Sequence, residues 1–249
     1  MGGEIDPALA RAMLEWQVEM GATDAVGDVP VDRLVAPSRP PEPAAPPAEP
    51  GDPVSEAHAA ASAALDLSAL KAAIAAYPHC ELRRGARNVV FADGVPGARV
   101  MIVGEAPGRD EDIEGLPFVG RSGRLLDLML AAIGLSRRAE DPAKGVYITN
   151  VMPWRPPQNR DPKADEIAMM KPFLRRHVEL AAPEILVPMG NPACAALLGK
   201  RGITKLRGVE TEALGLPALP MLHPAYLLRN PVAKREAWAD LLTLEERLG

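Results

Sequence analysis

Three polar stretches of this chain hold residue types that can bind a ligand and move a proton. The first, at 104–123, reads GEAPGRDEDIEGLPFVGRSG and combines glycines and carboxylates with one phenylalanine. The second, at 150–160, reads NVMPWRPPQNR, and the third, at 223–229, reads HPAYLLR. Each follows a short apolar run, so each falls where a strand is expected to end. What these stretches can do depends on whether the fold brings them together.

Strands that alternate with helices are predicted around the polar stretches. Apolar runs predict four strands, at 98–104, 146–151, 184–190 and 217–222. Helices are predicted between and after them, at 124–134, at 164–181, up to Leu198 and at 231–248. This alternation is typical of a parallel sheet that helices cover on both faces. Ligands bind at the carboxyl ends of the strands in such folds, which is where the three stretches fall.

The N-terminal part has a different composition. Residues 34–54 hold eight prolines, which is typical of an extended linker, and we place this linker at 34–55. Before it, apolar residues between Leu9 and Val18 predict a helix of about three turns. We expect residues 1–33 to form an appendage that packs on the main body or meets a protein partner. An alanine-rich helix at 57–76 would then open the main domain, 56–249.

Charge is divided unevenly over the 249 residues. The net charge of −5 arises from −9 in residues 1–69 and +4 in residues 70–249, so the charge of the main domain leaves room for a polyanion partner. Two cysteines form no disulfide framework and favour a reducing compartment. No apolar run has the length of a membrane span. We expect a cytoplasmic monomer with no membrane association.

The carboxylates at 110–114 have two simpler interpretations. They could hold Mg²⁺ in a nuclease or a phosphotransferase, but the companion carboxylates and histidines of a committed metal site are missing. They could equally be a solvated loop at the entrance of a helix. The GEAPG turn is not a phosphate-binding loop of the Walker type, because no Gly-Lys-Ser/Thr follows it.

Taken together and in this order, the motifs resemble the uracil-DNA glycosylase superfamily, in particular its family 4. The resemblance covers roughly residues 75–247. It implies a three-layer α/β/α fold with a central four-stranded parallel sheet. It also implies a monofunctional glycosylase that hydrolyses the N-glycosidic bond of uracil in DNA and so starts base-excision repair. The alternative is a catalytically silent module of the same fold that binds uracil or single-stranded DNA.

The resemblance assigns catalysis to Glu105, Asn150 and His223, and the uracil pocket to Gly104, Ala106, Pro107, Gly108, Glu111 and Phe118. Main-chain N–H groups of 104–106 would face the uracil O2 as an oxyanion hole does. Phe118 would stack on the base, and Asn150 would pair with O4 and N3–H. His223 would donate to O2 and stabilise the leaving anion. Glu111 would guard the C5 edge, where a thymine methyl would clash.

The resemblance assigns contacts with DNA, single- or double-stranded, to Arg155, Asn159, Arg160, Tyr226, Leu227, Leu228 and Arg229. A leucine of the last group would fill the stack that the flipped base leaves, and Arg229 would face phosphate or the orphan base. Arg155, Asn159 and Arg160 would contact DNA or help to order a water.

The group that activates the water is less well defined by the motifs. Other branches of the superfamily have Asp or Asn where this chain has Ala106, so Glu105 or a water near Asn159 must serve, or the reaction depends on electrostatics alone. Glu105 could instead bind loop N–H groups at the entrance of the helix. No lysine lies in these stretches, so no Schiff-base lyase step is expected.

Family 4 holds an iron–sulfur cluster with four cysteines, and only the first of these is kept. The four positions are occupied here by Cys80, Arg83, Trp154 and Met170. Because such clusters are held by cysteine thiolates, we expect no cluster and no other cofactor. Trp154 and Met170 are bulky enough to fill the space, and Arg83 could bridge carbonyls or an acidic side chain.

Overall fold

The computed structural model describes residues 6–20 and 51–249, which belong to two units. The described residues of the first unit, 6–20, form the helix α1 (Pro7–Glu19), where the sequence predicts one. Its N-terminus is capped by Asp6, which accepts a hydrogen bond from the Ala8 N–H at 3.0 Å. Residues 34–50 of the predicted linker lie outside the described residues. No helix in the described ranges is long and apolar enough to cross a membrane.

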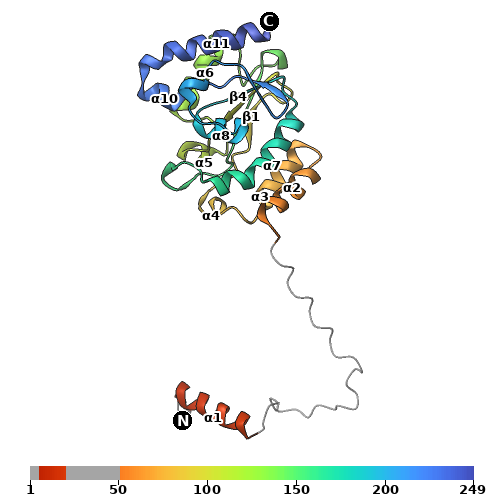
Figure 1. Ribbon diagram of the computed structural model, residues 1–249, viewed down its shortest axis with the longest axis vertical. Helices are drawn as coiled ribbons and strands as arrows, with labels where there is room; N and C mark the ends of the chain where they lie inside the picture. Colours follow the sequence, from red (N-terminus) through yellow and green to blue (C-terminus); the bar gives the residue numbers. More distant parts are fainter. Residues whose placement is uncertain (1–5, 21–50) are drawn as a thin grey trace. The chain divides into compact units, whose positions relative to one another are not determined.

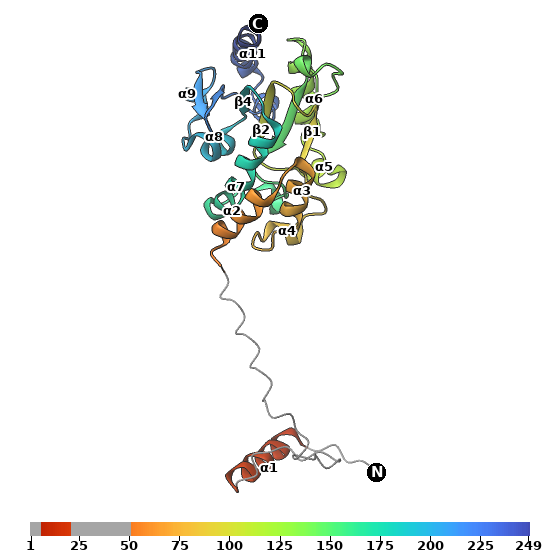
Figure 2. The same cartoon turned by 90° about the vertical axis from the view of Figure 1, so that its right-hand side faces the viewer.

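The second unit is built on a six-stranded sheet with the order β1-β3-β2-β4-β6-β5. Figures 1 and 2 show this sheet surrounded by helices. The strands are β1 (Ala92–Gly94), β2 (Val100–Gly104), β3 (Val146–Asn150), β4 (Ile185–Pro188), β5 (Thr211–Ala213) and β6 (Leu216–Ala218). The four central strands, β3, β2, β4 and β6, are parallel, as predicted. The edge strands β1 and β5 are antiparallel to their neighbours and were not predicted.

Helices cover both faces of this sheet. They are α2 (Pro53–Ala63), α3 (Leu67–Ala76), α4 (Leu82–Gly85), α5 (Arg109–Glu114), α6 (Arg121–Ala131), α7 (Ala164–Ala181), α8 (Asn191–Leu198), α9 (Ile203–Leu206), α10 (Pro224–Arg229) and α11 (Lys234–Leu248). Short 3₁₀ turns lie at Pro142–Lys144, Pro157–Asn159 and Pro231–Ala233. Figure 1 shows α2 and α3 beside α7, and α6 close to α10 and α11. The predicted three-layer α/β/α architecture is therefore confirmed.

The core consists of two apolar clusters, one on each face of the sheet. Side chains of β2 alternate between them: Met101 and Val103 pack with α2, α3 and α7, whereas Val100 and Ile102 pack with α6, α10 and α11. All five residues of β2 are buried, which explains why this strand reads as a continuous apolar run. The polar stretch that begins at Gly104 therefore starts from a rigid, buried support.

The single helix expected at 57–76 is two helices, so that prediction was wrong. Asp66 caps α3 by accepting a hydrogen bond from the Ala69 N–H at 2.7 Å, and its extended backbone ends any continuous helix there. The first of the two helices, α2, begins at Pro53, inside the range predicted for the linker. Its N-cap is Asp52, which accepts from the Ser55 N–H at 3.1 Å.

Candidate functional site

A cavity of about 290 Å³ lies at the carboxyl ends of the central strands. It is lined by Glu105, Ala106, Pro107, Gly108, Glu111, Phe118, Ser122, Asn150, Pro156, Asn159, Arg160, His223, Ala225 and Arg229. Residues of all three polar stretches of the sequence thus meet in one place. The fourth strand end, at Gly190-Asn191, does not contribute to this lining. Asn191 instead accepts hydrogen bonds from the N–H groups of Gly202 and Ile203.

His223 is the N-cap of α10, and this position fixes the tautomer of its ring. Nδ1 accepts a hydrogen bond from the main-chain N–H of Ala225 at 3.1 Å, so in the neutral ring the proton is on Nε2. Burial, with a contribution from the nearby Arg229, lowers the pKa of His223 to about 4. The cavity is therefore presented with a neutral imidazole whose Nε2–H is available as a donor.

Phe118 forms one wall of the cavity in an unusual backbone conformation. Its φ is +54°, a region that bulky residues rarely adopt, and its side chain is buried. Its ring stacks on that of His223 with the centroids 5.3 Å apart and the planes inclined by 30°. Gly104 leaves room for this arrangement, because a Cβ atom there would lie 2.6 Å from Cε2 of Phe118 and would also collide with the Asn150 amide.

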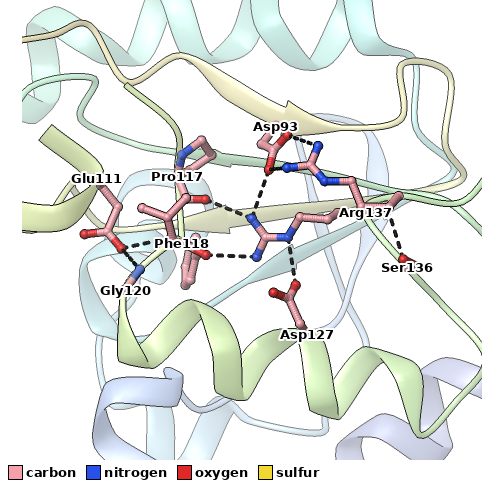
Figure 3. Close-up of polar contacts among 10 residues, drawn as sticks. Asp93, Glu111, Pro117, Phe118, Gly120, Asp127, Ser136 and Arg137 are labelled. Carbon is pink, nitrogen blue, oxygen red and sulfur yellow. Dashed lines mark hydrogen bonds and ion pairs between the residues drawn. The ribbon is translucent and has the colours of Figure 1, made fainter. Parts of the chain in front are cut away.

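The Glu111 carboxylate binds three main-chain N–H groups. Oε1 accepts from Val119 at 3.1 Å and from Gly120 at 2.9 Å, and Oε2 accepts from Gly108 at 3.1 Å. Gly108 and Gly120 are the N-caps of α5 and α6, so one carboxylate connects the two glycine turns of the pocket. Figure 3 shows its bond to Gly120. This is the structural role that the sequence suggested as an alternative for Glu105.

Glu105 faces the cavity in a partly buried position. Burial raises the pKa of Glu105 to about 7; Asp161 adds to the increase and Arg201 opposes it. A carboxyl group with this pKa changes its protonation state near neutral pH, which suits a group that accepts or gives up a proton. Ala106 beside it lines the cavity with a methyl group and offers no acid or base.

The proline-rich stretch after β3 places an amide and a guanidinium at the rim. Asn159 has φ +53° and accepts a hydrogen bond from Nε of Arg155 at 2.8 Å. The guanidinium of Arg160 forms a two-pronged ion pair with Glu166, with distances of 2.8 and 2.5 Å. Asn159 and Arg160 line the cavity, whereas Arg155 is not part of the lining and is connected to it through its bond with Asn159.

The HPAYLLR stretch forms α10, and its residues point in different directions. Tyr226 and Leu228 are exposed, by 36% and 37%, whereas Leu227 is only 1% exposed and packs in the core beside α6 and α11. The predicted DNA contact of Leu227 does not fit this burial, because successive residues of a helix face different sides. Arg229 is exposed at the cavity mouth.

Three lining residues, Ser122, Pro156 and Ala225, were missed by the sequence analysis. All three lie within the same polar stretches. Pro156 and Ala225 directly adjoin the predicted Arg155 and Tyr226, whereas Ser122 lies four residues after Phe118. Gly104 was predicted to line the pocket and lies just behind it, in contact with Phe118.

The acidic group at 110–114 does not converge on one point. The Asp112 carboxylate is buried and accepts hydrogen bonds from the N–H groups of Arg87 at 2.8 Å and Asn88 at 3.3 Å. Glu111 is engaged with the loops as described above, and Asp110 and Glu114 are exposed. Within residues 6–20 and 51–249, no three His, Cys, Asp or Glu side chains are grouped to hold a metal ion.

The four positions at which the resemblance expects cluster ligands hold an unsuitable set of donors. Cys80, Trp154 and Met170 are each 1% exposed and belong to the same apolar cluster. Cys80 is the only thiol of the four, whereas such clusters are held by several cysteine thiolates. Arg83 is exposed, so the bridging role suggested for it finds no support. This donor set does not fit an iron–sulfur cluster.

Comparison with known proteins gives consistent matches to one family. The family described as the uracil DNA glycosylase superfamily matches residues 91–242. The type-4 uracil-DNA glycosylase of Sulfurisphaera tokodaii is 37% identical over 190 residues, covering 72% of this chain and 84% of that protein. The type-4 uracil-DNA glycosylase of Thermotoga maritima is 42% identical over 154 residues, covering 61% of this chain and 77% of that protein.

Proposed function

Since this chain belongs to the uracil DNA glycosylase superfamily, we propose that it is a uracil-DNA glycosylase that starts base-excision repair. Its substrate is a uracil in DNA that has rotated out of the base stack and into the cavity. The observation that carries this proposal is the meeting of Phe118, Asn150 and His223 in one cavity. Together they supply a stacking surface, an amide and a neutral N–H donor, which are the groups that recognition of a pyrimidine requires.

The reaction breaks the bond between N1 of uracil and C1′ of the sugar. The bonding electron pair stays with the base, so negative charge develops on the uracil O2 while the sugar becomes oxocarbenium-like. The Nε2–H of His223 stabilises this charge, as donors of an oxyanion hole do. Asn150 pairs with O4 and N3–H, and Phe118 holds the plane of the ring. Water then adds to C1′ and loses a proton, which leaves an abasic site, and the uracil anion takes up a proton from solvent.

Glu105 is the group that we propose accepts the proton of this water. Its raised pKa of about 7 makes it a stronger base than an ordinary carboxylate, and part of the population is ionised at neutral pH. Glu111 also lines the cavity, but its carboxylate already accepts hydrogen bonds from three N–H groups. We propose that Glu111 shapes the C5 side of the pocket through these bonds.

The enzyme is proposed to act as a monofunctional, monomeric glycosylase without an iron–sulfur cluster. No lysine lines the cavity within the described residues, so an amine that could open the sugar is missing from its walls. Trp154 and Met170 fill core volume that the resemblance assigns to the cluster ligands. The DNA would contact Arg229, Tyr226, Leu228 and the stretch from Arg155 to Arg160. Helix α1, with Leu14 and Trp16 more than 60% exposed, is proposed to meet a protein partner.

Release of uracil from a single-stranded oligonucleotide in EDTA tests the function directly. Cleavage of the strand should appear only after alkali treatment, because a monofunctional enzyme leaves the backbone intact. His223→Ala and Asn150→Ala should lose activity, on protein whose iron content is measured at the same time. Strand cleavage without alkali would instead indicate a lyase.

The alternative function is a silent module that binds uracil or single-stranded DNA. The observation that favours it is Ala106, which places a methyl group where other branches have a water-activating residue. A wild-type protein that binds the oligonucleotide but releases no base would support this alternative.

A further inference from the structure

We infer that Arg137 is a positioning residue that holds Phe118 in its base-stacking conformation. This inference rests on the proposed function and adds a residue that lies outside the cavity and all three sequence motifs. Arg137 follows α6 on the way to β3, and its side chain is only 6% exposed. A guanidinium buried to this extent needs partners for its N–H groups, and those partners are specific here.

The guanidinium donates hydrogen bonds to two successive main-chain carbonyls of the Phe118 loop. Nη1 donates to the Pro117 oxygen at 2.9 Å, and Nη2 donates to the Phe118 oxygen at 3.0 Å (Figure 3). These bonds fix the two peptide planes on either side of the Phe118 Cα. They therefore hold the residue at φ +54°, a value that a bulky side chain does not adopt without support.

Two carboxylates hold the guanidinium in place. Asp127 on α6 accepts from Nε of Arg137 at 2.7 Å, and Asp93 on β1 accepts from Nη1 at 3.1 Å. Asp93 is held in turn by the guanidinium of Arg138, at 2.8 and 3.0 Å. The loop is thereby attached to a helix and to the edge of the sheet, both of which are rigid elements.

A hollow beside the loop explains why the loop needs these contacts with Arg137. A second hollow of about 460 Å³ is bordered by Phe118, Asp127 and Arg137. Because none of the described residues fills this hollow, the loop has room to relax once its carbonyls are released. Where the loop packs on α6 it has no such freedom, since a Cβ at Gly123 would collide with the Phe118 carbonyl oxygen. Arg137 thus selects one conformation of a loop that could otherwise move away from the base.

The ring position can be observed without any activity. The chain has three phenylalanines, so protein that carries 4-fluorophenylalanine should give three ¹⁹F signals, of which Phe118 is assigned by its loss in Phe118→Leu. In Arg137→Lys this signal alone should shift or split, because lysine cannot bind both carbonyls and Asp127. The other two signals report that the core is intact. An unmoved Phe118 signal would overturn the inference.

Two further variants sharpen this experiment. Arg138→Lys is the matched control: the Arg138 side chain is 66% exposed, and among the described residues its hydrogen bonds go to Asp93 and not to the Phe118 loop. Because lysine can keep the ion pair with Asp93, the Phe118 signal should stay in place. Asp127→Ala removes a carboxylate that is 47% exposed and should keep the fold. It should move the Phe118 signal in the same direction by a smaller amount. If Arg137→Lys does not fold, this shift in Asp127→Ala tests whether Arg137 positions Phe118.

Kinetics distinguish a positioning role from a general structural one. Single-turnover excision by Arg137→Lys should be roughly 10- to 100-fold slower than wild type, because misplaced contacts weaken the transition state. Its affinity for the oligonucleotide should change less than about twofold, since the loop contacts the base and not the phosphates. In a Phe118→Leu background the same substitution should have little further effect, and additive losses would overturn the inference. A wild type without base release would refute the proposed function, while the ¹⁹F result would still decide the role of Arg137.

Discussion

Leu227 and Leu228 are neighbours in α10 with opposite environments: the first is 1% exposed and the second 37% exposed. Only Leu228 can enter a base stack. Leu228→Ala should lower excision from duplex DNA by roughly tenfold, equivalent to about 1.4 kcal/mol, and leave excision from single strands almost unchanged. The physical reason is that a duplex must be unstacked to release the base, whereas a single strand is already open. Parallel single-turnover assays on both substrates make the measurement.

The control for this prediction is the other leucine. Leu227→Ala should lower the free energy of unfolding by about 2–5 kcal/mol, because it opens a cavity in the core. Urea unfolding measures this loss. An equal effect of Leu228→Ala on single and double strands would contradict the role of Leu228 as a wedge.

His223 should act as a neutral donor at every pH above about 5. With a pKa near 4, it stays uncharged through the range in which an ordinary histidine titrates, so the excision rate should show no inflection from this ring near pH 6.5. His223→Asn keeps an acceptor for the N-cap but loses the Nε2–H, and it should be roughly 100- to 1,000-fold slower. Histidine ¹⁵N spectra should show the Nε2–H tautomer, and a ring that titrates near pH 6.5 would refute this reasoning.

The same lowered pKa has a consequence for stability. A histidine whose folded pKa is depressed contributes stability above its unfolded pKa and loses it as the pH falls toward the folded value. His223 should therefore lower the free energy of unfolding progressively as the pH falls from 6.5 to about 4. In that window wild type should lose of the order of 2 kcal/mol relative to His223→Asn. Unfolding at pH 7 and pH 4.5 measures the difference.

Glu105 should control the pH dependence of catalysis. If its ionised form takes the proton from water, the rate should rise with pH through about 7 and then level off. Glu105→Gln should be slower and should lose this rise. The free energy of unfolding should change with pH in the direction opposite to the rate. A carboxyl group whose pKa is raised in the folded state lowers the free energy of unfolding as the pH rises from 4.5 through 7. Above pH 7 the glutamine variant should therefore be more stable than wild type, by of the order of 2 kcal/mol.

The sequence was sufficient for the central strands and for most of the cavity. Strands such as β2 and β3 are buried along their whole length, so their apolar runs stand out from the polar stretches that follow. The edge strands β1 and β5 have three residues each, and ADG and TEA carry no such pattern. They form because a neighbouring strand offers free main-chain groups, which a sequence pattern does not reveal.

The supporting contacts of the site were not predictable in the same way. Glu111 was expected at the pocket, but its three N–H partners come from two turns whose approach depends on the whole fold. Arg137 lies beyond α6, in a stretch with no motif, and its partners are 10, 19, 20 and 44 residues away in sequence. Such contacts follow from tertiary packing, which the local propensities of the sequence do not encode.

Trp154 and Met170 should contribute stability in place of a metal cluster. Trp154 is 1% exposed, so Trp154→Ala should lower the free energy of unfolding by about 3–5 kcal/mol. The control is Trp238→Ala, at a side chain that is 45% exposed, and its cost should be clearly smaller. Chelators should leave both the unfolding midpoint and the activity of wild type unchanged. Loss of either on chelation would show that a metal ion supports the fold.

The last prediction concerns the boundary between the two units. Because α2 begins at Pro53 with Asp52 as its cap, the working domain should begin near residue 51, and deletion of residues 1–50 should leave excision on naked oligonucleotides near wild type. Deletion of residues 1–64 removes α2, whose Ala57 and Ala61 are buried against the body. The longer deletion should lower the unfolding midpoint, since it exposes apolar surface of α7. A large loss of turnover after the shorter deletion alone would show that α1 or the proline-rich segment takes part in catalysis.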